Sequence, residues 1–170
     1  LDEVVKEMQG IEVKPEVDIQ IDLNVTSYIP EEYIQDSNQK IEIYQDIALC
    51  KNEEDIQNVT DEIIDRFGDM PGELENLIDI ARIKYLAKAL KISKIASKKT
   101  AVLITFAENQ FSYDIPKLVK EYGNRLKFSA GIKPMITLEI GTNNEMKILN
   151  DVTEFLKTLD KMEINQKIKR

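Results

Sequence analysis

Residues 92–99 (ISKIASKK) and 101–107 (AVLITFA) decide the fold class, because the hydrophobic pattern of the chain changes here. Together the two segments contain Val, Ile, Thr and Phe, and these residue types favour β-strands. Two further strands are expected over residues 125–130 (RLKFSA) and 134–140 (PMITLEI), joined by a turn. These four segments predict a sheet of roughly four strands in the second half of the chain.

Before Leu90 the apolar residues follow a helical spacing. Three helices are expected: one over about 37–51, capped by Asp36 or Ser37, one that follows the N-cap Asn52, and one that begins at Pro71. The side chains expected to face the core are Ile41, Tyr44, Ile47 and Ala48 in the first, Ile56, Val59, Ile63 and Phe67 in the second, and Leu74, Leu77, Ile78, Ala81 and Tyr85 in the third.

The remaining segments complete an α+β domain. Residues 17–24 alternate between apolar and polar side chains, which predicts a half-buried strand. A short helix is expected over 116–122, and a longer one over about 145–162. Leu1 to Gly10 carries the spacing of the last turns of a helix. A helical first half and a β-rich second half favour a single compact α+β domain over a regular βαβ alternation.

The net charge of −8 argues against a nucleic acid as a direct partner, since 31 acidic residues outnumber 23 basic ones. The basic residues come closest to clustering at Lys98 and Lys99 and in the tail after residue 166. An acidic domain is better placed to meet a basic protein surface. No apolar run approaches the roughly 20 residues of a membrane helix, so a soluble protein is expected.

Several kinds of chemistry are excluded by composition. The chain has no histidine and one cysteine, Cys50, so histidine-based catalytic triads, the usual zinc sites and internal disulfides are absent. Neither a phosphate-binding loop nor a GxGxxG string occurs. Paired carboxylates could hydrolyse a glycoside, but no pair stands out. No catalytic residue, metal ligand or cofactor-binding residue is therefore predicted.

The helical segment TDEIIDRFGDMP (60–71) raises a different possibility. Its apolar residues Ile63, Ile64 and Phe67 are expected to point inward, and Gly68 to end the helix. Taking Ile56 as zero and 100° per residue, the exposed charges Glu62, Asp65 and Arg66 lie at about 240°, 180° and 280°. This spacing permits two interpretations, a solvated face with a Glu62–Arg66 ion pair or a docking surface.

The order of segments resembles the C-terminal domain of bacterial transcription-repair coupling factors, over roughly residues 13–160. The similarity is carried by SYIPEEYI (27–34), QKIEIYQDIA (39–48), DEIIDRFGDMP (61–71), LIDIARIKYLAKALKI (77–92) and AVLITFAE (101–108). The most specific pieces contain the residues expected to form a structural motif, namely Tyr28, Pro30, Tyr44, Phe67 and Gly68.

The resemblance implies a function that composition does not reveal. Full-length members of the family are ATP-driven translocases on double-stranded DNA that displace stalled RNA polymerase and recruit the repair protein UvrA in the bacterial cytoplasm. ATP and Mg²⁺ belong to the motor, and no cofactor is expected in this domain. The resemblance assigns residues 1–14 to the end of a linker helix from the motor, 15–162 to a regulatory domain and 163–170 to a tail.

In the family this domain packs on an N-terminal module similar to UvrB, hides the UvrA-binding surface and restrains the motor. The resemblance therefore implies that Glu62, Asp65 and Arg66 form an intramolecular interface. The alternatives that remain open are a stand-alone protein-interaction module, a carboxylate-based hydrolase and a nucleic-acid-binding domain.

Overall fold

The computed structural model describes residues 19–107 and 111–168, with side chains described up to residue 163. The expected helix at 1–10 and the proposed linker at 1–14 lie outside the described residues. The elements, in chain order, are β1 (Gln20–Asp22), α2 (Ser37–Ala48), α3 (Glu53–Phe67), α4 (Gly72–Ala89), β2 (Ile92–Lys98), β3 (Ala101–Phe106), α5 (Ile115–Tyr122), a 3₁₀ turn (Gly123–Arg125), β4 (Leu126–Ser129), β5 (Met135–Glu139) and α6 (Glu145–Ile168). Within this part of the chain, no helix combines the length and apolarity required to span a bilayer.

The sheet has five strands in the order β1-β2-β3-β5-β4. The four strands expected in the second half pair antiparallel, which confirms the α+β class, and β1 pairs parallel to β2 at the edge. The strand expected over 17–24 is shorter than its alternation suggests. It ends at Asp22 because the next residues form a tight turn, in which the Val25 amide donates to the Leu23 carbonyl at 2.8 Å.

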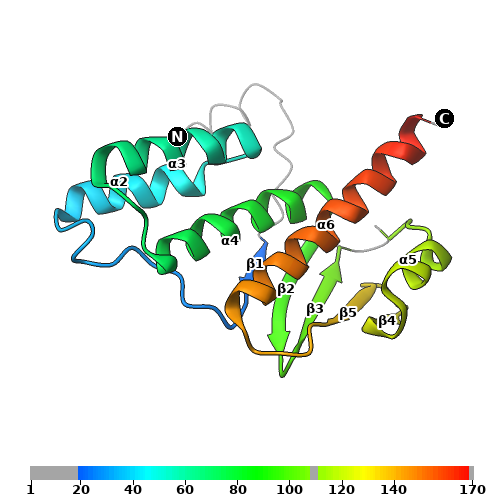
Figure 1. The fold of residues 1–170 in the computed structure, drawn as a ribbon. Coiled ribbons are helices and arrows are strands. Elements are labelled where there is room, and N and C mark those ends of the chain that lie inside the picture. Colours follow the sequence, from blue (N-terminus) through cyan, green and yellow to red (C-terminus); the bar gives the residue numbers. More distant parts are fainter. Residues whose placement is uncertain (1–18, 108–110, 169–170) are drawn as a thin grey trace, which may run out of the picture.

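Helices α4 and α6 pack against one face of the sheet (Figure 1). The core between these two helices and the sheet takes its side chains from alternate strand positions, because successive side chains of a strand point to opposite faces of the sheet. Its largest fully buried members include Ile95, Ile104, Phe106 and Phe155. Helix α6 continues beyond the expected end at Met162 to Ile168.

A second core lies among α2, α3 and the first half of α4. Its buried side chains are Ile29, Ile34, Ile43, Ile47, Ile56, Val59, Ile63, Leu74 and Ile78. The remainder of α4 contributes Ile83, Leu86 and Ala87 to the core under the sheet. Helix α4 therefore links the two cores, and a single apolar stripe does not describe it.

Some predicted core positions are wrong. In α2 the buried residues are Ile43 and Ile47, whereas Ile41 is 55% exposed and Ala48 is also exposed. Ile41 lies two residues from Ile43, about 200° around the helix, so the two cannot share a face. Ile64 is 43% exposed, because only its neighbour Ile63 points into the core. The helix caps Asp36 and Asn52 are confirmed, since each side chain accepts backbone amides of the first turn.

Candidate docking site on helices α2 and α3

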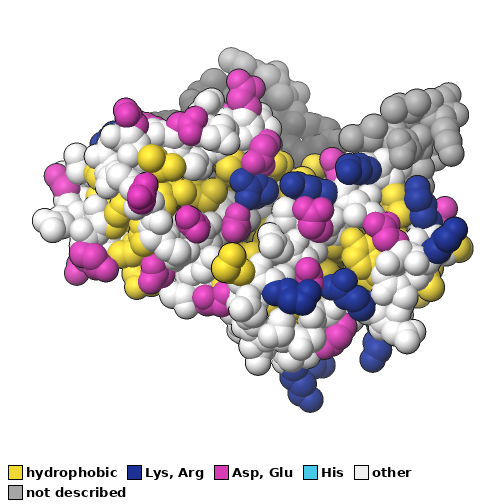
Figure 2. Space-filling view, in the orientation of Figure 1, with side chains coloured by type: hydrophobic (Ala, Val, Ile, Leu, Met, Phe, Trp, Pro, Cys, Tyr) yellow, Lys and Arg dark blue, Asp and Glu magenta, His cyan; other side chains and the backbone are white. Residues whose placement is uncertain are grey.

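The exposed face of α3 carries the three charges singled out in the sequence. Acidic side chains gather over α2 and α3 in Figure 2. Arg66 is held in place: its Nη1 lies 3.4 Å from Glu62 Oε1 and 3.9 Å from Glu42 Oε1 of α2. Its guanidinium also lies 5.0 Å from the centre of the Phe67 ring. Asp65 is exposed and has no hydrogen-bond or ion-pair partner in the described part of the chain.

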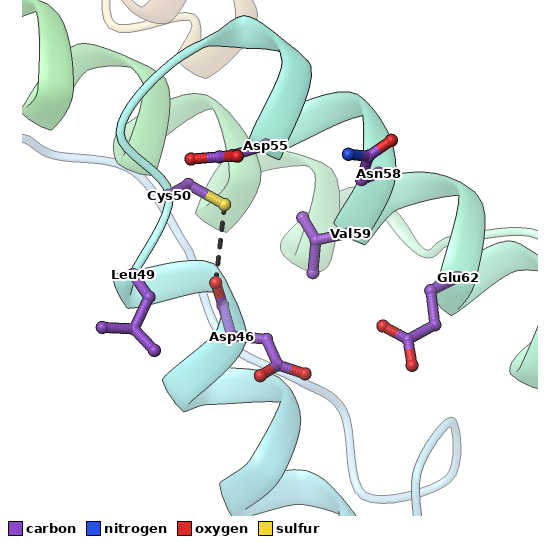
Figure 3. A pocket seen from close by; sticks show the side chains of 7 residues that line it. All are labelled: Asp46, Leu49, Cys50, Asp55, Asn58, Val59 and Glu62. Carbon is purple, nitrogen blue, oxygen red and sulfur yellow. Dashed lines mark hydrogen bonds between the residues drawn. The ribbon is translucent and has the colours of Figure 1, made fainter.

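A hollow of about 310 Å³ adjoins this face between the end of α2 and the start of α3 (Figure 3). Glu62 lines it, so one of the three predicted residues is part of a concave surface and the other two lie next to it along α3. The residues that line the hollow are Asp46, Leu49, Cys50, Asp55, Asn58, Val59 and Glu62.

Of the residues that line this hollow, only Glu62 was predicted as a site residue. Asp55 and Asn58 lie at about 260° and 200° in the same helical projection, close to Glu62, so helical spacing alone could have grouped them. Asp46 and Leu49 could not be found in that way, because they come from α2 and only the packing of the two helices brings them near.

The hollow combines carboxylates with an exposed apolar edge. Asp46, Asp55 and Glu62 supply negative charge, and Leu49 at the end of α2 is 68% exposed. Long basic side chains have an apolar stem and a cationic end, so this combination suits a lysine or arginine from a partner surface. The arrangement can therefore recognise a basic group by charge and by contact with its stem.

Cys50 is not poised as a nucleophile. Its thiol donates to the Asp46 carbonyl at 3.4 Å, as the dashed line in Figure 3 marks. Burial raises the pKa of the Cys50 thiol, and the nearby Asp55 and Asp46 raise it further. A thiol with a raised pKa stays protonated at neutral pH. Among the described residues, no group of three or more His, Cys, Asp or Glu side chains is placed to hold a metal ion.

The segment before α2 is fastened to the helices by the predicted motif residues. The Tyr44 hydroxyl accepts the buried Ile29 amide at 2.8 Å. Pro30 is itself buried, and its carbonyl accepts the Tyr33 and Ile34 amides at 3.1 and 3.2 Å. These bonds place a turn of chain against the second core and connect it to α2.

The same segment also reaches the end of α3. The Tyr33 hydroxyl donates to the Gly68 carbonyl at 2.5 Å, and its ring lies 6.0 Å from the Phe67 ring. Gly68 ends α3 with a φ of 91°, which glycine adopts more readily than other residues. Tyr28 differs from the other motif residues, because its side chain is 46% exposed. The contacts of Tyr33 fix the end of α3 that carries Asp65 and Arg66.

The start of α3 is fixed by a cluster that the sequence did not indicate. Arg82 of α4 donates to both carboxylate oxygens of Glu53, at 2.8 and 2.9 Å, and to Asp79 at 2.7 Å. The Tyr85 hydroxyl donates to Glu53 at 2.9 Å. The hydrogen bonds from Arg82 lower the pKa of Glu53, while burial raises the pKa of Asp79. Helix α3 is therefore attached at both ends, and its charged face is held in a defined orientation.

Fold and site together define a class of protein: an α+β domain whose candidate site is an exposed helical surface suited to contact with another macromolecule. Its fold matches a solved structure described as the crystal structure of the C-terminal domain of transcription-repair coupling factor. That match has a TM-score of 0.78 at 20% sequence identity and covers 91% of this chain and 99% of the solved one. This similarity shows the fold.

The particular family follows from the sequence comparisons. The family model of the TRCF domain matches residues 23–115. Transcription-repair-coupling factors from Rickettsia prowazekii and Bacillus subtilis are 35% and 34% identical to the chain over 82% and 78% of its length. The chain belongs to the transcription-repair coupling factor family, as the sequence motifs predicted. It spans 12% and 11% of the length of these two relatives.

Proposed function

We propose that this chain is the regulatory C-terminal domain of a transcription-coupled DNA repair translocase. In this proposal its α2–α3 face, defined by Glu62, Asp65, Arg66 and the adjoining hollow, packs on an N-terminal UvrB-like module of the same protein. That contact masks the surface that binds UvrA and restrains the motor. The observation that carries the proposal is the charged face of α3, which is attached at both ends and lies beside an acidic hollow, with Asp65 unpaired among the described residues.

The acidic and basic residues of the face have opposite roles in the contact. Glu62 and Asp65 accept hydrogen bonds from basic groups of the module, and Arg66 pairs with an acidic group. Arg66 already lies beside Glu62 and Glu42, so it has less side-chain freedom to lose on docking than an arginine without neighbours. Mixed charges at an interface contribute orientation and reversibility more than affinity, which suits a contact that must open.

The other activities of the proposed protein lie outside this chain. The motor binds ATP and Mg²⁺ and moves along double-stranded DNA, while RNA polymerase and UvrA bind elsewhere on the full-length protein. This domain contributes regulation, and its proposed partner is intramolecular.

The test is the triple variant E62A/D65A/R66A of the full-length protein, assayed for ATPase activity and UvrA binding. The proposal expects both to rise, since the domain no longer holds the module. The matched control is E121A/E154A/K161A, which also removes two acidic and one basic exposed side chain, but from α5 and α6. Unchanged ATPase activity and UvrA binding in a folded triple variant, or equal increases in the control, would exclude this face as the restraint.

A further inference from the structure

Two consecutive segments of the chain differ in the sign of their charge. Residues 27–90, which contain α2, α3 and α4, carry 15 acidic and 6 basic side chains. Residues 91–141, which contain β2 to β5, carry 9 basic and 4 acidic side chains. In Figure 2 the acidic groups gather on the left, over α2 and α3, and most of the basic groups lie on the right. The net charge of −8 therefore conceals a basic segment, residues 91–141.

The sheet exposes one face. Side chains alternate along each strand, and the register places the polar set opposite the face covered by α4 and α6. None of its side chains is buried and none is aromatic. The members of this outer face are Gln20, Asp22, Lys94, Ala96, Lys98, Ala101, Leu103, Thr105, Lys127, Ser129, Met135, Thr137 and Glu139.

The outer face carries three lysines. Lys94, Lys98 and Lys127 are exposed, and none has an ion pair within the described ranges. Lys94 and Lys98 are four residues apart, about 13 Å along β2, and Lys127 lies three strands away, about 14 Å across the sheet. The three lysines place positive charge at separated points of the outer face.

The acidic residues of the outer face reduce this charge without cancelling it. Asp22 lies on the edge strand β1, and Glu139 already accepts a hydrogen bond from the Thr100 hydroxyl at 2.5 Å. Two more exposed lysines flank the face, Lys99 at the β2–β3 turn and Lys133 between β4 and β5.

We propose that the outer face of the sheet binds the phosphate backbone of double-stranded DNA. Lysine, threonine and serine side chains are common phosphate-binding groups, and all three occur on this face. Single-stranded binding relies on aromatic side chains that stack on bases, and the outer face has none. A duplex presents one charge per roughly 1.7 Å of its axis, which makes it the densest anionic partner for a flat lysine surface.

An acidic protein is the less suitable partner. Protein interfaces depend on buried anchors, chiefly aromatic residues and arginine, and the outer face offers only the half-buried Leu103 and Met135 as large apolar groups. The acidic α2–α3 face and the outer face of the sheet are built from different elements, so the two surfaces share no residues. The inference is independent of the proposed docking on the UvrB-like module.

The test is a fluorescence-anisotropy titration of the 170-residue chain with a short labelled DNA duplex of mixed sequence, repeated over a range of salt concentrations. Three neutralised phosphates predict a slope of log K against log salt of about −2.7, or a loss of roughly 40-fold between 50 and 200 mM salt. The variant K94A/K98A/K127A should lose nearly all of this salt-dependent binding.

The control is K51A/K84A/K161A, which removes the same charge from exposed positions off the sheet. It should bind the duplex with a slope close to that of the unmodified chain. Circular dichroism checks that both variants fold. Absence of duplex binding at low salt, or equal losses in the two variants, would overturn the inference. Displacement of the duplex by polyglutamate at equal charge concentration would instead identify an acidic-protein surface and overturn the assignment to DNA.

Discussion

Tyr85 shows how a single side chain connects the site to the fold. It contacts both cores, and its hydroxyl donates to Glu53, which Arg82 also holds. Burial, followed by this hydrogen bond to the Glu53 carboxylate, raises the pKa of Tyr85 from 10.0 to about 12. The neutral hydroxyl is therefore favoured in the folded chain, and the stability that it contributes depends on its proton.

The stabilisation by the Tyr85 hydroxyl depends on pH. Because the folded pKa is raised, the stabilisation is fully present below pH 10 and is lost as the pH rises through about 12. The difference in free energy of unfolding between the unmodified chain and Y85F should be constant below pH 10 and shrink above it. Urea denaturation of both proteins across this range measures the difference. Other tyrosines titrate equally in both proteins, so a difference that stays constant to pH 12 would contradict the assigned contact.

At the scale of the elements, α4 has the central position. Leu74 and Ile78 pack in the core with α2 and α3, whereas Ile83, Leu86 and Ala87 pack under the sheet. A helix shared in this way should make the two cores unfold together. The same helix carries Arg82, so it also sets the position of α3.

We predict that I78A and I83A each lower the free energy of unfolding by about 2–5 kcal/mol, the range for truncating a buried aliphatic side chain. Both side chains are nearly or fully buried, at 4% and 0% exposure, but they belong to different cores. Helical and near-ultraviolet circular dichroism signals should shift to lower urea together in both variants. Separate transitions for the two signals, or loss of only one of them in either variant, would show that α4 does not couple the cores.

Most elements could be predicted from the sequence, because their signals are local. The capping residues Asp36 and Asn52 identified the starts of two helices. The β-branched and aromatic residues of 92–107 identified the change from helices to a sheet. The dual role of α4 was missed, since a helix with apolar residues on two sides shows no single stripe. The exposed Ile41 and Ile64 were misplaced because an isoleucine alone does not reveal which face of a helix is covered.

The site was only partly predictable, because only some of its residues are neighbours on a single helix. Glu62, Asp65 and Arg66 share a face by helical spacing alone, which needs one element. The hollow and the Glu53–Arg82 contact need two elements each, and their residues are separated in sequence. Their assembly depends on tertiary packing, for which a single sequence holds no direct pattern.

At the scale of the whole molecule, the two cores carry surfaces of opposite character. The helical half offers an acidic, mixed-charge face, and the outer face of the sheet offers lysines that have no ion pair within the described ranges. This separation lets one small domain approach two different partners without mutual interference. The α2–α3 face of the helical half is proposed to dock on the UvrB-like module.

The most direct test is the affinity of the 170-residue chain for the isolated N-terminal UvrB-like module, measured by calorimetric titration with the unmodified chain, E62A/D65A/R66A and E121A/E154A/K161A. If the α2–α3 face forms the contact, the first variant should bind about tenfold more weakly or worse, equivalent to about 1.4 kcal/mol, and the second should bind like the unmodified chain. Equal affinity of all three proteins for the module would contradict the claim.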